Sequence, residues 1–118
     1  MRIVNRVLVT VFLAQAKDLI AAGHITFYNR TKNITTLAAL GLRRQQQLEI
    51  LQSLQPENYC YNVDPLEGAE EDGWVFGMQE QIVELYIKLN ITTIPDNGQR
   101  VVCISFHEAE QTLSYPYG

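Results

Sequence analysis

The chain has 118 residues, of which 47% are hydrophobic and 19% are charged, and its formal net charge is −4. This length supports one domain, residues 1–118, with a hydrophobic core of its own and little room for a second. The composition is typical of a soluble globular protein, and the negative charge taken alone argues against a nucleic-acid partner.

The negative charge is concentrated in one segment that also contains glycine and proline. This segment holds five acidic residues: Asp64, Glu67, Glu70, Glu71 and Asp72. The rest of the chain is nearly neutral, and a group of basic residues lies far from the acidic segment in sequence: Arg30, Lys32, Arg43 and Arg44. The charge distribution therefore weighs slightly against RNA as a partner without excluding it.

The first predicted element is a helix from Val9 to Ala22. Apolar residues recur there at intervals of three and four, and Gly23 is placed to end the helix. The apolar stretch from Val7 to Ile20 is too short and too polar to span a bilayer, and it continues as an amphipathic helix instead of stopping at a signal-peptide cleavage site. We therefore expect a cytoplasmic protein.

A short strand and a second helix are expected next. Residues 24–29 form a brief apolar and polar run that fits a strand. Thr31 or Asn33 can cap a helix that ends at Leu40, before another glycine.

A third helix is predicted from about Arg43 to Ser53, because the chain reaches Pro56 soon afterwards. Arg43 and Arg44 would open this helix, where positive charge is unfavourable, which hints at a contact with phosphate or with an acidic partner. The helix should bury three leucines: Leu48, Leu51 and Leu54.

From residue 57 onward the hydrophobic period changes to two, which is typical of strands. The predicted strands are residues 59–63, 74–78, 83–91 and 101–107, with the acidic loop after the first and a turn at 79–81 after the second. Residues 108–118 are expected to be irregular. Three helices followed by about four antiparallel strands predict an α+β fold with the helices packed on the sheet.

The last two strands form the most regular pattern in the chain. Alternation from 83 to 91 places Glu84, Tyr86 and Lys88 on one face and aliphatic residues on the other. The segment Pro95–Gly98 is suited to a hairpin turn. If Ile94 pairs with Gln99, Lys88 faces Ser105 and Tyr86 faces His107. If the turn is Asn97-Gly98 alone, Lys88 faces His107.

Either register presents a carboxylate, a phenol, an ammonium and an imidazole on one solvent-facing surface. Solvated strands commonly expose polar groups, so the pattern also fits a surface without function. Histidine titrates near neutral pH, and beside a phenol and a cation it can move protons in the cleavage of RNA through its ribose 2′-OH. That reaction needs no metal, because the 2′-OH supplies the nucleophile, and it selects RNA over DNA.

Other motifs of enzyme chemistry are missing from the sequence. There is no phosphate-binding glycine loop, no CxxC or HExxH pair and no nucleophile elbow. Cys60 and Cys103 lack the spacing of a disulfide framework and are expected to be reduced thiols. We expect no metal and no small-molecule cofactor.

Several segments in order resemble the motility quorum-sensing regulator family of bacterial toxins. They include Leu13–Gly23, Ala39–Leu42, the stretch from Leu54 to Tyr61, and Trp74, followed by Glu84–Leu89 and Val102–His107. The resemblance implies a RelE-like fold and an mRNA-cleaving toxin of a type II toxin–antitoxin pair. It also implies two partners, a cognate antitoxin and mRNA.

Residue by residue, the resemblance places Tyr86 on the family's catalytic tyrosine. His107 stands where better-known members have a lysine after Ser-Phe, and a histidine suits general acid–base chemistry near neutral pH. Tyr61 stands where a functional lysine is expected, and Val75 where a glutamine is expected. Lys88 or Arg100 can supply the missing positive charge.

The sequence therefore predicts a metal-independent endoribonuclease, a hydrolase with two groups of site residues. His107 would act as general acid or base, Tyr86 would orient or protonate, Lys88 would stabilise phosphate, and Glu84 would be a base or an ion-pair partner. Contacts to RNA are expected from Tyr61, Trp74, Arg43, Arg44 and Arg100. Trp74 also fits a core residue. The alternative is a non-catalytic protein-interaction module on the same fold.

Overall fold

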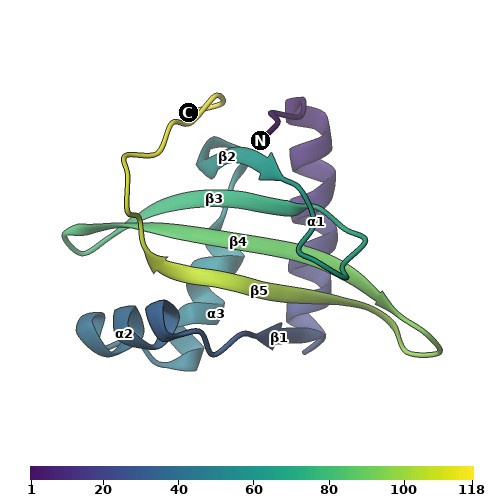
Figure 1. Ribbon diagram of the computed structural model, residues 1–118, viewed down its shortest axis with the longest axis horizontal. Helices are drawn as coiled ribbons and strands as arrows, with labels where there is room; N and C mark the ends of the chain where they lie inside the picture. The colour runs from purple at the N-terminus through teal and green to yellow at the C-terminus, as the bar shows by residue number, and fades with distance from the viewer.

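Three helices and five strands make up the computed structural model, which describes residues 1–118 and is α+β (Figure 1). The helices are α1 (Arg6–Ala21), α2 (Thr31–Leu40) and α3 (Arg44–Ser53). The strands are β1 (Ile25–Phe27), β2 (Tyr59–Val63), β3 (Gly73–Glu80), β4 (Val83–Ile94) and β5 (Gly98–Glu108), and a short 3₁₀ turn, Pro56–Asn58, precedes β2.

The strands form a single sheet in the order β1-β5-β4-β3-β2. The four predicted antiparallel strands, β2 to β5, are confirmed, and each pairs with its neighbour in sequence. β1 adds a fifth strand that runs parallel to β5, so the sheet is mixed. Three residues suffice for this pairing because the His24 carbonyl and the Tyr28 N–H extend its hydrogen bonds to β5 at both ends.

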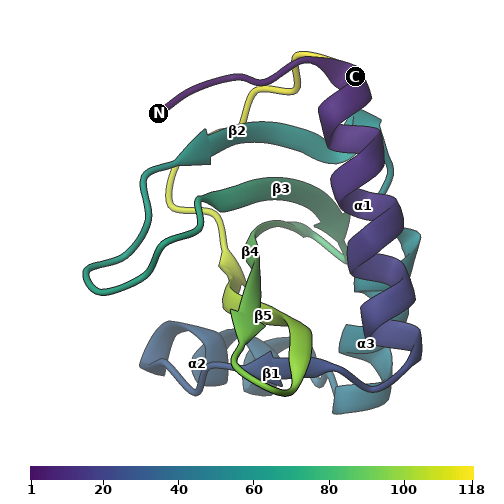
Figure 2. The same ribbon diagram turned by 90° about the vertical axis from the view of Figure 1, so that its right-hand side faces the viewer.

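One face of the sheet is covered by α1 and α3 (Figure 2). The buried core lies between these helices and the sheet and includes Phe12 of α1, Leu51 of α3, and Phe76, Ile87 and Phe106 of the sheet. α2 lies beside the β5 edge instead (Figures 1 and 2). The centre of the second face therefore remains open.

The helix ends differ slightly from the prediction. α1 begins three residues before Val9, because the Asn5 side chain caps it by accepting a hydrogen bond from the Leu8 N–H at 3.0 Å. Leu51 and Leu54 are buried as predicted, whereas Leu48 is only half-buried against the core. Asn33 does not cap α2. It lies inside the helix, and its side chain is buried.

The register of the β4–β5 hairpin changes along its length. At the turn Ile94 pairs with Gly98, which is neither predicted register. Between Leu89↔Cys103 and Lys88↔Ser105 the ladder shifts by one residue, so Ile104 has no partner and forms a β-bulge. Beyond the bulge Lys88 faces Ser105 and Tyr86 faces His107, the pairing of the first predicted register.

This bulge also exchanges the two faces of β5. Before it Val101 and Cys103 point into the core, and after it Phe106 does. Strict alternation along β5 would place Cys103 on the same face as Ser105 and His107, but the extra residue reverses the alternation of side chains. His107 reaches the open face only because of the bulge.

Asn33 supports the bulged strand from the side. Its amide nitrogen donates to the carbonyl of Ile104 at 3.1 Å, and its amide oxygen accepts from the N–H of Phe106 at 2.9 Å. One turn later the Thr36 hydroxyl accepts from the N–H of Glu108 at 3.1 Å. Side chains of α2 thus take over the hydrogen bonds that β1 makes earlier along β5, which leaves no open strand edge there.

Cys60 and Cys103 are both free and buried, as predicted for reduced thiols. Burial raises the pKa of each thiol to about 12. None of the helices is long and apolar enough to cross a membrane.

Replacing Asn33 by alanine should strongly destabilise the protein. The carbonyl of Ile104 and the N–H of Phe106 would remain buried without partners, which should lower the free energy of unfolding by roughly 2–4 kcal/mol. Urea denaturation measures this change. The control is Asn29→Ala in the exposed loop before α2, and equal losses in the two variants would contradict the role given to Asn33.

Candidate active site on the open face of the sheet

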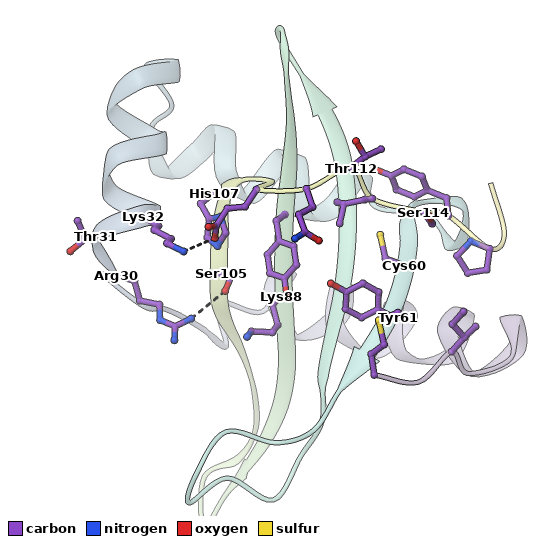
Figure 3. Close-up of a pocket in the computed structure, with 18 residues that line it drawn as sticks. Arg30, Thr31, Lys32, Cys60, Tyr61, Lys88, Ser105, His107, Thr112 and Ser114 are labelled. Atoms are coloured by element: carbon purple, nitrogen blue, oxygen red, sulfur yellow. Dashed lines mark hydrogen bonds and ion pairs between the residues drawn. The ribbon is translucent and has the colours of Figure 1, made fainter.

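A cleft of about 930 Å³ occupies the open face of the sheet (Figure 3). Its floor is formed by side chains of β2, β4 and β5. The beginning of α2 forms one wall, residues 110–116 of the C-terminal segment form another, and Met1 and Ile3 complete the rim. Tyr86, Lys88 and His107 all line this cleft, so the three residues expected to act together do lie together.

Tyr86 and His107 face each other across β4 and β5. Their rings are stacked, with centroids 5.2 Å apart and planes inclined by 16°. His107 Nδ1 lies 2.8 Å from the carbonyl oxygen of Glu108. A carbonyl only accepts hydrogen bonds, so Nδ1 carries the hydrogen, and in the neutral ring Nε2 keeps the lone pair that can take a proton.

The surroundings of Tyr86 keep its hydroxyl protonated. Burial raises the pKa of Tyr86 well above its ordinary value, and the neighbouring hydroxyl of Tyr61 raises the pKa further. At neutral pH this phenol is therefore a hydrogen-bond and proton donor, and a base role is excluded for it.

Positive charge collects at one end of the cleft. Lys88 is half-buried, and its pKa is lowered first by burial and then by the nearby Arg30. Arg30 donates from Nη1 to the Ser105 hydroxyl at 3.3 Å, and Lys32 forms an ion pair with Glu110. Glu110 is the one carboxylate that lines the cleft, and none of the acidic residues 64–72 does. The cleft is thus cationic although the chain is acidic.

Sequence reasoning missed Arg30, Lys32 and Ser105 as site residues. Arg30 and Lys32 stood out only as part of a basic group with Arg43 and Arg44. The fold separates this group, because the start of α2 lies over the cleft whereas α3 lies behind the sheet (Figures 2 and 3). No local pattern distinguishes the two pairs, since the distinction depends on where each helix packs.

Glu84 does not line the cleft, and its carboxylate is already engaged. Oε1 accepts from the Leu113 N–H at 3.1 Å, and Oε2 accepts from the Tyr115 hydroxyl at 2.7 Å. The backbone carbonyl of Glu84 also accepts from the Ala109 N–H at 2.7 Å. The geometry therefore assigns Glu84 to anchoring the C-terminal segment, in place of the expected base or ion pair with Lys88.

Of the residues expected to contact RNA, only Tyr61 lines the cleft. Trp74 points to the other face, where it stacks on Phe12 with ring centroids 4.2 Å apart, so it packs half-buried against the core. The guanidinium of Arg44 lies 3.6 Å above the Phe27 ring of β1, and Arg43 immediately precedes α3. Arg100 donates to the Ile25 carbonyl at 2.9 Å, near the far end of the hairpin.

No group of three or more His, Cys, Asp and Glu side chains lies close enough together to hold a metal ion. No protein-family model matches the chain, and a comparison with curated proteins gives no match either.

Glu84→Ala should release the C-terminal segment while the rest of the fold persists. The substitution removes the acceptors for the Leu113 N–H and the Tyr115 hydroxyl, but the core residues on the other face of β4 are unchanged. We expect faster hydrogen exchange or proteolysis confined to residues 109–118, as measured by mass spectrometry. Glu80→Ala on β3 is the control. Unchanged protection of 109–118 in Glu84→Ala would contradict the anchoring role.

Proposed function

We propose that this protein is an endoribonuclease that cuts mRNA through the ribose 2′-OH, the toxin of a type II toxin–antitoxin pair. The observation that carries the proposal is the convergence of an imidazole, a phenol and several cations in one cleft. His107 and Tyr86 are stacked there, and Lys88 lies two residue pairs further along the same two strands, on the same face.

The proposed reaction is a transesterification at one phosphodiester. The 2′-oxygen attacks the adjacent phosphorus while its proton leaves to a base, and the bond from phosphorus to the 5′-oxygen breaks. The leaving 5′-oxygen gains a proton, and the products are a 2′,3′-cyclic phosphate and a 5′-hydroxyl. The nucleophile belongs to the substrate, so the protein must supply only a base, an acid and positive charge.

The three residues divide these tasks according to their surroundings. His107 accepts the 2′-OH proton at Nε2, because Nδ1 is held as a donor to the Glu108 carbonyl. Tyr86, protonated at neutral pH, donates to the leaving oxygen or to a phosphoryl oxygen. Lys88 stabilises the negative charge that builds up on the pentacoordinate phosphorus.

Arg30 and Lys32 supply the further positive charge that the resemblance led us to seek. In the related toxins a lysine is expected where Tyr61 stands, and a glutamine where Val75 stands. Val75 is fully buried and pairs with Lys88 and Tyr61 on the sheet. In the proposal, cations from the start of α2 replace the lysine missing from the sheet, and Arg100 takes no part.

Two elements of the proposal rest on the resemblance. A RelE-like fold is supported by three helices that precede the four consecutive antiparallel strands β2 to β5. The antitoxin partner is supported by the order of the similar segments alone. The proposed antitoxin is a small protein encoded beside this chain, and its co-expression should restore the growth of cells that express the chain.

Replacing His107 by alanine should abolish most of the RNA cleavage. Loss of a positioned general base typically costs about 10²–10⁴-fold in rate. Purified protein and a labelled mRNA measure the rate directly. The matched control is His24→Ala, since the other histidine of the chain is exposed and outside the cleft. Binding of RNA without cleavage by the unaltered chain would favour the interaction module instead, and equal cleavage by His107→Ala would refute the mechanism.

The alkaline side of the pH–rate profile should report on Lys88. Its ammonium must stay protonated to act, and its lowered pKa makes activity fall at a lower pH than for an ordinary lysine. Arg30→Gln removes a positive neighbour, so the pKa of Lys88 should rise and the fall in kcat should move to higher pH. In Lys88→Arg, kcat should show no such fall within the accessible pH range, because a guanidinium stays protonated there. A shift to lower pH in Arg30→Gln would contradict the assignment.

A further inference from the structure

The two ends of the cleft differ in chemistry (Figure 3). Arg30, Lys32 and His107 gather at one end, on the side of α2 and β5. The opposite end carries Cys60 and Tyr61 of β2 and the hydroxyls of Thr112 and Ser114, and no lysine or arginine side chain lines it. A cationic end suits a phosphate, whereas an aromatic ring beside neutral donors and acceptors suits a nucleobase.

The C-terminal segment that forms the wall at the neutral end is held by packing contacts and hydrogen bonds. Leu113 and Tyr115 pack against Gly77 of β3 so closely that a Cβ there would lie 2.3 Å from the Tyr115 hydroxyl and 2.6 Å from Leu113 Cδ1. The Glu84 carboxylate binds the same two residues. Further on, Tyr117 stacks on Tyr59 with ring centroids 6.0 Å apart and donates to the Val4 carbonyl.

Three polar side chains of this segment, Gln111, Thr112 and Ser114, make no hydrogen bond inside the protein. Gln111, Thr112 and Ser114 line the cleft and are exposed, whereas the residues that alternate with Thr112 and Ser114 are the anchors. A glutamine amide offers a donor and an acceptor side by side, the arrangement that recognises the edge of a base. Because the backbone that carries these side chains is anchored, binding has less of the chain to order, which favours discrimination between bases.

We propose that the cleft binds one nucleotide unit of RNA, with its phosphate among Arg30, Lys32 and Lys88 and its base against Tyr61 and the C-terminal segment. Gln111 and Thr112 then determine which base is accepted beside the cut. The volume of the cleft is suited to one nucleotide, since clefts of about 300–1,000 Å³ commonly hold small organic ligands. This inference rests on the proposed ribonuclease function. It adds that the ribonuclease prefers one base beside the cut and names the residues that select that base.

The test measures binding of mononucleotides, without cleavage. Isotope-labelled protein is titrated with the nucleoside 3′- and 5′-monophosphates of all four bases, with inorganic phosphate and with the free nucleosides, and followed by NMR. One base should bind roughly tenfold more tightly than the weakest. Inorganic phosphate should perturb the signals of Arg30, Lys32 and Lys88, whereas the preferred nucleotide should also perturb Tyr61 and residues 111–114. The tighter of the 3′ and 5′ series shows on which side of the phosphate the base lies.

Gln111→Ala and Thr112→Ala should reduce the difference between bases and leave the affinity for inorganic phosphate unchanged. Gln45→Ala, on the exposed surface of α3, is the control and should keep the full difference. Equal binding of all four bases by the unaltered chain, or a preference that survives both substitutions, would overturn the inference.

The outcomes for the two proposals are separate. A chain that prefers one base in binding but leaves RNA intact would refute the ribonuclease and keep base recognition by the C-terminal segment. A chain that cuts RNA but binds all four bases equally would refute base recognition by the C-terminal segment alone.

Discussion

The hydrogen bonds of Asn33 to the bulged part of β5 connect three features that otherwise have no reason to coincide. The amide holds Ile104 and Phe106 in place of a neighbouring strand, which permits one extra residue in β5 without an unsatisfied edge. The extra residue turns His107 to the open face. The same contact fixes the start of α2 beside the cleft, so the cations of α2 and the imidazole of β5 reach one site through one buried side chain.

Local charge in this protein is decided by how the chain folds, and the net charge of −4 gives little guidance to it. The acidic loop between β2 and β3 is held by ion pairs from Arg2 to Asp64 and Asp72, and it contributes nothing to the cleft lining. The cations lie instead at the beginning of α2 and on β4. Electrostatic attraction acts over about 10 Å at 0.1 M salt, so a substrate in the cleft responds to these near charges more than to the total.

Burial sets the protonation states on which the proposed chemistry depends. A half-buried phenol stays neutral and donates, and a half-buried ammonium releases its proton more readily than a solvated one. Glu84 lies on the same strand but has a structural role. Its carboxylate is used to hold the C-terminal segment, and that segment closes one side of the cleft.

The sequence by itself determined the three helices, the four antiparallel strands and the face of β4 that carries Tyr86 and Lys88, because hydrophobic periodicity reports directly which side of an element is buried. It also predicted that Tyr86, Lys88 and His107 share one surface. The pairing of Ile94 with Gln99 that was assumed at the turn was wrong, because Ile94 pairs with Gly98. Only the tertiary structure decided the bulge at Ile104, the parallel β1 edge, the engagement of Glu84 and the separation of Arg30 and Lys32 from Arg43 and Arg44. These features depend on which distant groups satisfy each buried hydrogen bond, and such pairings leave no periodic mark in the chain.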